Sequence, residues 1–102
     1  MGGAFDFDRW TEWSRDKAGA LSIQSRQFVF RQSDAPLASF GIAADSPTAV
    51  GDFRCWQNQL VDFEVIEVRS GKLASSETML QVSDDNFEQV FGSFVDAFEK
   101  VN

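Results

Sequence analysis

The chain has 102 residues, of which 43% are hydrophobic and 14% aromatic, and it carries a formal net charge of −7. This length and composition predict a single folded domain spanning residues 1–102, and they exclude a disordered tail. The negative charge argues against nucleic acid and anionic membranes as partners, because both are polyanions.

The first predicted element is a helix over residues 6–18. Side chains recur at helical spacing along one face and form a stripe: Phe7, Trp10, Ser14, Lys17 or Ala18, and Leu21. Asp6 and Asp8 stand at the N-terminal end, where carboxylates cap free backbone amides and oppose the helix dipole. Gly19 is expected to end the helix.

After this helix the spacing of apolar residues changes to two, which is typical of strands. A first strand is expected to place Phe28 and Phe30 on one face. Residues 33–36 have the composition of a turn. A second strand is then predicted over residues 37–44.

Residues 50–69 form the most informative stretch. Two apolar-rich runs flank a polar break at residues 57–59, and this pattern predicts a β-hairpin. With those three residues as the loop, Phe53 lies opposite Phe63, and strand periodicity gathers the apolar side chains on one face. That face comprises Phe53, Cys55, Val61, Phe63 and Val65.

The other face of the same hairpin carries Arg54, Trp56, Asp62 and Glu64. Exposed tryptophan and arginine are enriched among interface hot spots, and acidic neighbours attract a basic surface. We therefore predict that these four residues bind a partner. The alternative is that Trp56 packs beneath a neighbouring loop or strand.

A turn at residues 70–72 leads to a fifth strand over about 73–82, whose polar middle predicts an edge position. The last helix is expected to begin with Ser83 as its N-cap and with Asp84 and Asp85 in its first turn. Its apolar stripe spans roughly five turns: Phe87, Phe91, Phe94, Phe98 and Val101.

The predicted order of elements is therefore helix, five strands, helix. Short turns between consecutive strands imply an antiparallel five-stranded meander. Both amphipathic helices need an apolar partner, and one face of the sheet is apolar. We expect an α+β domain in which the N- and C-terminal helices pack together on that face.

Groups that carry chemistry are scarce in this sequence. It has no histidine and no tyrosine, and its one cysteine, Cys55, is expected to fill space in the core. No glycine-rich phosphate loop follows a strand. We therefore expect no cofactor, no metal and no enzymatic activity. The competing interpretation is a hydrolase that uses Asp62 and Glu64 with a metal, which would require a concave site around both carboxylates.

A cytoplasmic location is expected. The N-terminal residues lack the basic and apolar regions of a signal peptide. No apolar stretch approaches the roughly 20 residues that a membrane-spanning helix requires. A single cysteine also forms no internal disulfide, so the fold does not depend on an oxidising compartment.

The hairpin sequence also resembles a known family. From Cys55 to Val68 an aromatic residue, a short polar break and an acidic–apolar alternation follow one another; a turn, one further strand and a phenylalanine-rich helix come next. Over about residues 35–101 this pattern resembles the immunity protein TriTu family, among the small immunity proteins of bacterial polymorphic and contact-dependent toxin systems. The resemblance implies a small cytosolic α+β domain that binds and neutralises a cognate toxin.

Two functions are therefore weighed. The first is an immunity protein, a monomer or weak homodimer, that contacts the C-terminal domain of its toxin. A nuclease is the expected toxin, because an acidic domain can imitate the polyanion that a nuclease binds. The alternative is an acidic secretion chaperone that holds an export substrate in apolar grooves, and a stable homodimer would favour it.

Overall fold

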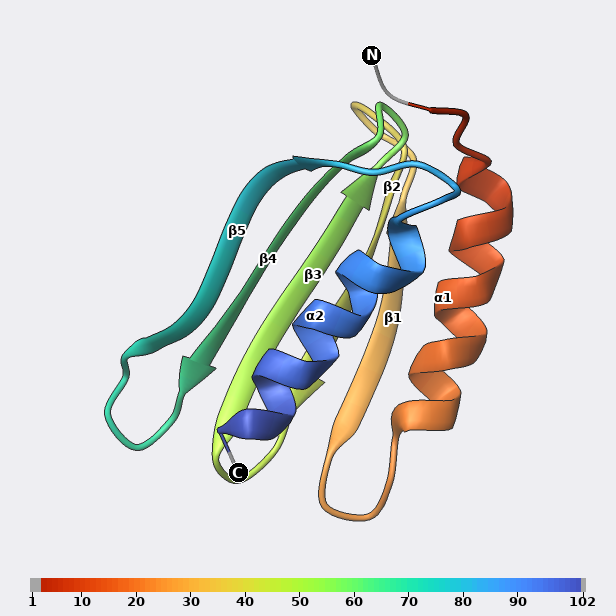
Figure 1. Cartoon of the computed structure of the whole chain (residues 1–102). Helices are drawn as coiled ribbons and strands as arrows, with labels where there is room; N and C mark the ends of the chain where they lie inside the picture. Colours follow the sequence, from red (N-terminus) through yellow and green to blue (C-terminus); the bar gives the residue numbers. More distant parts are fainter. Residues whose placement is uncertain (1–2, 102) are drawn as a thin grey trace.

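A computed structural model describes residues 3–101, and its elements follow one another in the predicted order (Figure 1). Helix α1 (Phe7–Leu21) comes first and helix α2 (Phe87–Lys100) last. The strands between them are β1 (Gln27–Ser33), β2 (Ser39–Asp45), β3 (Ala49–Trp56), β4 (Leu60–Glu67) and β5 (Leu73–Gln81).

The five strands form one antiparallel meander in which each strand pairs with its neighbours in the chain. Both helices lie on the same face of this sheet, with α1 beside β1 and α2 across the middle strands, while β5 extends beyond them (Figure 1). The predicted α+β arrangement and the edge position of β5 are both confirmed. Among residues 3–101, no helix lies on the opposite face of the sheet.

The β3–β4 hairpin has the register that the sequence predicted. Strand β3 ends at Trp56 and β4 begins at Leu60, so residues 57–59 form the loop. The predicted cross-strand partners are paired: Phe53 with Phe63, Cys55 with Val61, and Arg54 with Asp62. The apolar face of the hairpin is buried beneath α2, and the mixed face lies on the side without helices.

The core between sheet and helices is dominated by phenylalanine. The α2 side chains Phe87, Phe91, Phe94 and Phe98 are all buried, as the stripe predicted. Phe53 of β3 is fully buried among them, with its ring centroid 5.2 Å from that of Phe91 and 5.5 Å from that of Phe94. The same rings therefore attach α2 to the strand that carries the mixed face on its other side.

Helix α1 continues past the predicted end. Asp6 caps it as expected, because its carboxylate accepts a hydrogen bond of 3.1 Å from the backbone N–H of Arg9. The prediction that Gly19 ends the helix is wrong, since α1 runs to Leu21. One glycine costs a helix only about 1 kcal/mol relative to alanine. The half-buried Leu21 packs against the core and extends the helix.

Helix α2 begins later than predicted. Its N-cap is Asn86 rather than Ser83, and residues 84–86 form a turn before the helix. The side-chain oxygen of Asn86 instead accepts the backbone N–H of Ser83 at 2.7 Å. The assignment of Asp84 and Asp85 to the first turn of α2 is also wrong, because both lie in the turn before it. The Asp84 carboxylate accepts hydrogen bonds from the backbone N–H of Asp6 at 2.9 Å and from the indole N–H of Trp10 at 2.8 Å.

The Asp84 contacts predict a pH-dependent stability. The backbone hydrogen bond from Asp6, followed by that from the Trp10 indole, holds the pKa of Asp84 below its usual range. Such a carboxyl stabilises the fold above its unfolded pKa of about 3.9, and this contribution is lost as pH falls through the lower folded pKa. We expect Asp84→Asn to lower the Tm at pH 7, and the difference to shrink below pH 4.

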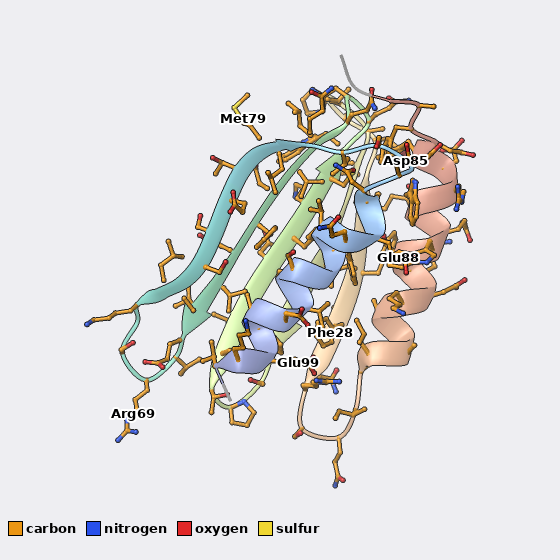
Figure 2. All side chains as sticks on the ribbon, viewed as in Figure 1. Phe28, Arg69, Met79, Asp85, Glu88 and Glu99 are labelled. Atoms are coloured by element: carbon orange, nitrogen blue, oxygen red, sulfur yellow. The ribbon has the colours of Figure 1, made fainter. Side chains whose placement is uncertain are left out.

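The neighbouring Asp85 provides the control for this experiment. Its side chain is exposed near the start of α2 (Figure 2). Asp85→Asn should leave the Tm almost unchanged at both pH values in calorimetric scans. A Tm difference for Asp84→Asn that stays constant from pH 7 to pH 3 would contradict the assigned role of its charge.

Two glycines, one in a crowded site and one in an open site, give a second stability prediction. A methyl group on Gly51 of β3 would lie 3.0 Å from a ring carbon of Phe94, which is fully buried. A methyl group on Gly92 of α2 would meet nothing within 4 Å. We expect Gly51→Ala to destabilise the fold by about 1–3 kcal/mol through overpacking. Gly92→Ala should stabilise it by up to about 1 kcal/mol. Urea unfolding measures the change in the free energy of unfolding for each variant. Changes of the same sign would contradict the packing described.

Candidate protein-binding surface

The face of the sheet without helices holds all four residues predicted to bind a partner. Arg54 and Trp56 come from β3, and Asp62 and Glu64 from the adjacent β4. Glu64 is exposed and the other three are half-buried. The structure therefore brings the four together on one surface, called here the open face, but gives them different surroundings.

Arg54 is directed towards β2. Its guanidinium donates a hydrogen bond of 3.0 Å to the hydroxyl of Ser39. It also lies against Gly41, where an added Cβ would come within 3.0 Å of Nη2. Within residues 3–101 it forms no ion pair with Asp62, its cross-strand partner. The positive charge of Arg54 is thus held to one side of the acidic part of the open face.

Asp62 holds a bulge in strand β5. The β4–β5 register shifts between Val61 and Phe63, so β5 has two residues, Thr78 and Met79, opposite the single Asp62. A carboxylate oxygen of Asp62 accepts the backbone N–H of Met79 at 2.7 Å. Met79 itself has a φ of 55°, in the left-handed region that side chains other than glycine seldom adopt.

An acidic hollow of about 220 Å³ lies between β4 and β5 on this face. Its lining includes four acidic residues, Asp52, Asp62, Glu64 and Glu77, of which Glu77 is the cross-strand partner of the core residue Phe63. Asp52 of β3 pairs directly with Glu64 of β4, so two negative charges face each other across the strands. Among residues 3–101, no three side chains of the metal-ligating types lie close enough to hold an ion.

A second, more apolar hollow of about 260 Å³ adjoins the first. It is bordered by Leu37, Trp56, Asn58, Leu60, Asp62 and Met79. Met79 is the most exposed of its large apolar residues, with 71% of its surface exposed. Figure 2 shows its side chain standing clear of the ribbon near the end of β5 that leads to α2. Trp56 is half-buried at this hollow, so it is neither fully covered by a loop nor fully free.

Sequence reasoning missed several members of this surface, among them Leu37, Asp52, Glu77 and Met79. Asp52 could have been found, because the pairing of Arg54 with Asp62 places residue 52 opposite residue 64. Glu77 and Met79 gave no such signal, since a bulge in β5 alters the alternation on which a strand prediction depends. Cys55, in contrast, is fully buried as predicted, and burial raises the pKa of its thiol to about 12. It therefore stays protonated at neutral pH and inert as a nucleophile.

Comparison with known families decides the class of protein. The family model of the immunity protein TriTu matches residues 6–97. The chain belongs to the immunity protein TriTu family. The resemblance seen in the sequence covered about residues 35–101. The family match begins further towards the N-terminus and therefore includes α1 and β1. No curated protein and no solved structure matches the chain.

Membership of the TriTu immunity family indicates that the chain neutralises a toxin protein by binding it. Immunity proteins of this family are generally not enzymes. Across residues 3–101, neither helix is long and apolar enough to cross a bilayer.

Proposed function

We propose that the chain neutralises its toxin in the cytoplasm by holding the C-terminal domain of the toxin against the open face of the sheet. The contact residues in this proposal are Arg54, Trp56, Asp62 and Glu64. The observation that carries it is the direct pairing of Asp52 with Glu64. Like charges directly opposite each other on neighbouring strands destabilise a sheet. A basic partner relieves that repulsion, so binding restores the stability that the free fold loses to the repulsion between Asp52 and Glu64.

The charge of the open face also supports a particular class of toxin. Within residues 3–101, none of the acidic residues that line the hollow forms an ion pair with Arg54, whose guanidinium is instead hydrogen-bonded to Ser39. A patch of one sign attracts a surface of the other sign and speeds encounter. We propose that the toxin is a nuclease, because the groove in which a nuclease binds its polyanionic substrate is basic.

The sheet edges support action as a monomer. At the β1 edge the hydroxyl of Ser22 accepts the backbone N–H of Phe28 at 2.9 Å and lies 3.2 Å from its carbonyl oxygen. At the β5 edge the ladder is broken by two register shifts. Bulges and covered backbone groups are the means by which proteins keep edge strands from pairing with other chains. The open face, rather than an edge, is therefore the surface we assign to the partner.

A pull-down tests this function. A tagged chain is expressed in its native bacterium, and proteins retained through moderate salt are identified by mass spectrometry. We expect the C-terminal fragment of a large secreted toxin, recovered with the unmodified chain and reduced with Trp56→Ala. Equal recovery with both chains would place the contact elsewhere. Recovery of an export substrate or a secretion ATPase would favour the chaperone interpretation instead.

A further inference from the structure

Met79 is the most exposed large apolar side chain on the open-face side of β5, at 71% exposure. Its backbone is also in an uncommon conformation, with a φ of 55°. Such positions cost energy and persist only where surrounding structure enforces them, and bulges commonly re-aim a side chain next to a functional site. Here the bulge directs Met79 to the border of a hollow that Trp56 and Leu37 also line.

The Asp62 carboxylate is the group that enforces this conformation. It accepts the Met79 backbone N–H at 2.7 Å, across the point where β4 and β5 lose their regular pairing. That N–H belongs to the extra residue of the bulge, whose ladder pairing is disrupted. Asp62 thus supplies the hydrogen-bond acceptor that the broken ladder lacks at this residue, and it does so with a carboxylate, which forms stronger bonds than a neutral acceptor.

The chemistry of the two hollows indicates what docks there. The apolar hollow has a volume of about 260 Å³, which is below the roughly 300–1,000 Å³ of typical small-molecule sites. Asp62 borders it and also borders the acidic hollow, where Asp52, Glu64 and Glu77 lie. A partner that fills both therefore places an apolar side chain immediately beside lysine or arginine. Methionine suits such a site because its flexible thioether adapts to the shape of an inserted group.

We propose that Asp62 is a positioning residue, which fixes the β5 bulge so that Met79, Trp56 and Leu37 receive an apolar side chain of the toxin. A lysine or arginine next to that side chain binds at Asp52 and Glu64. This proposal rests on the proposed function and specifies the part of the toxin that is recognised. It also distinguishes two acidic residues: Asp62 acts through the backbone of Met79 in addition to its charge, and Glu64 acts through its charge alone.

The test uses the toxin domain recovered in the pull-down and a chain labelled with ¹³C at its methionine methyl groups. The sequence contains two methionines, Met1 and Met79, so Met79 gives one of two signals, which Met79→Leu assigns. We expect the Met79 signal to shift when the toxin domain is added. Met79→Ala should weaken binding about tenfold, as the loss of an interface anchor does. Met79→Leu should stay within about twofold because it keeps the apolar contact.

Two variants of Asp62 separate its position from its charge. Asp62→Asn keeps an oxygen that accepts the Met79 N–H but removes the charge, so we expect an unmoved Met79 signal in the free chain and a loss of binding that is clearly smaller than that of Asp62→Ala. Asp62→Ala removes the acceptor. Asp62→Ala should move the Met79 signal and weaken binding about as much as Met79→Ala does. The double variant should bind only slightly more weakly than Met79→Ala alone. Circular dichroism checks that each variant is folded, and Asp62→Asn and Met79→Leu still decide the matter if Asp62→Ala unfolds.

The outcomes distinguish this proposal from the function on which it rests. If the unmodified chain binds no toxin domain, the proposed function fails and this inference fails with it. If the chain binds but Met79→Ala binds equally well, only the docking site is overturned. Equal weakening by Asp62→Asn and Asp62→Ala would show that Asp62 acts through charge. A Met79 signal that depends on protein concentration without toxin would identify a second copy of the chain as the occupant.

Discussion

A Glu64→Lys chain is expected to associate with the toxin domain about tenfold more slowly than the unmodified chain at low salt. Glu64 is exposed on the open face and lines the acidic hollow opposite Asp52. A lysine there places a positive charge where the basic partner arrives, and it pairs with Asp52 within the chain. Association rates measured by stopped flow or surface plasmon resonance test this directly.

Salt dependence and a matched variant identify the cause. The screening length falls from about 10 Å at 0.1 M salt to about 3 Å at 1 M, so the two rates should converge as salt rises. Glu88→Lys changes the net charge equally, but Glu88 lies on α2, on the helical side of the sheet (Figure 2). It should slow association much less. Equal effects of the two variants would show that net charge matters and the open face does not.

The β3–β4 hairpin could be predicted because its signals are local. Strand periodicity sorts Phe53 and Arg54 onto opposite faces, and the polar break at residues 57–59 fixes the register. One detail of the loop does not follow the usual sequence preference. Its left-handed position, with a φ of 71°, is occupied by Gln59 rather than by glycine or asparagine. Its side-chain amide donates to the carbonyl oxygens of Gly3 and Val82, and these contacts with distant segments tie it in place.

Where the prediction was wrong, a long-range contact had replaced a local one. Ser83 and Asp84 are good capping residues for a helix. The Asp84 carboxylate nevertheless binds Asp6 and Trp10, more than seventy residues away in the chain, and α2 begins only at Phe87. The bulge at Met79 has the same origin, because its backbone N–H donates to the Asp62 carboxylate of β4, a partner that the local pattern of β5 does not reveal. The part of the candidate surface on β3 and β4 could therefore be predicted from the sequence, and the part on β5 could not.

The core beneath the open face gives the largest expected loss of stability. Phe53 is fully buried, and its ring contacts those of Phe63, Phe87, Phe91 and Phe94. Phe53→Ala should lower the free energy of unfolding by about 3–5 kcal/mol, because it removes the buried ring and leaves a cavity. That is a large part of the roughly 5–15 kcal/mol by which a domain is stable. Phe53 faces the core, whereas Arg54, the next residue in β3, lies on the open face. The substitution therefore removes no contact residue, and binding should fall only in proportion to the unfolded fraction.

Phe30→Ala removes the same ring from a half-buried position on the edge strand β1, where it stacks on Phe40. It should cost clearly less than Phe53→Ala in urea unfolding followed by tryptophan fluorescence, because an edge site exposes part of the ring already and leaves less cavity. An equal cost for the two variants would mean that the rings around Phe53 close the cavity. The open face would then depend on its strand pairing rather than on the attachment of β3 to α2.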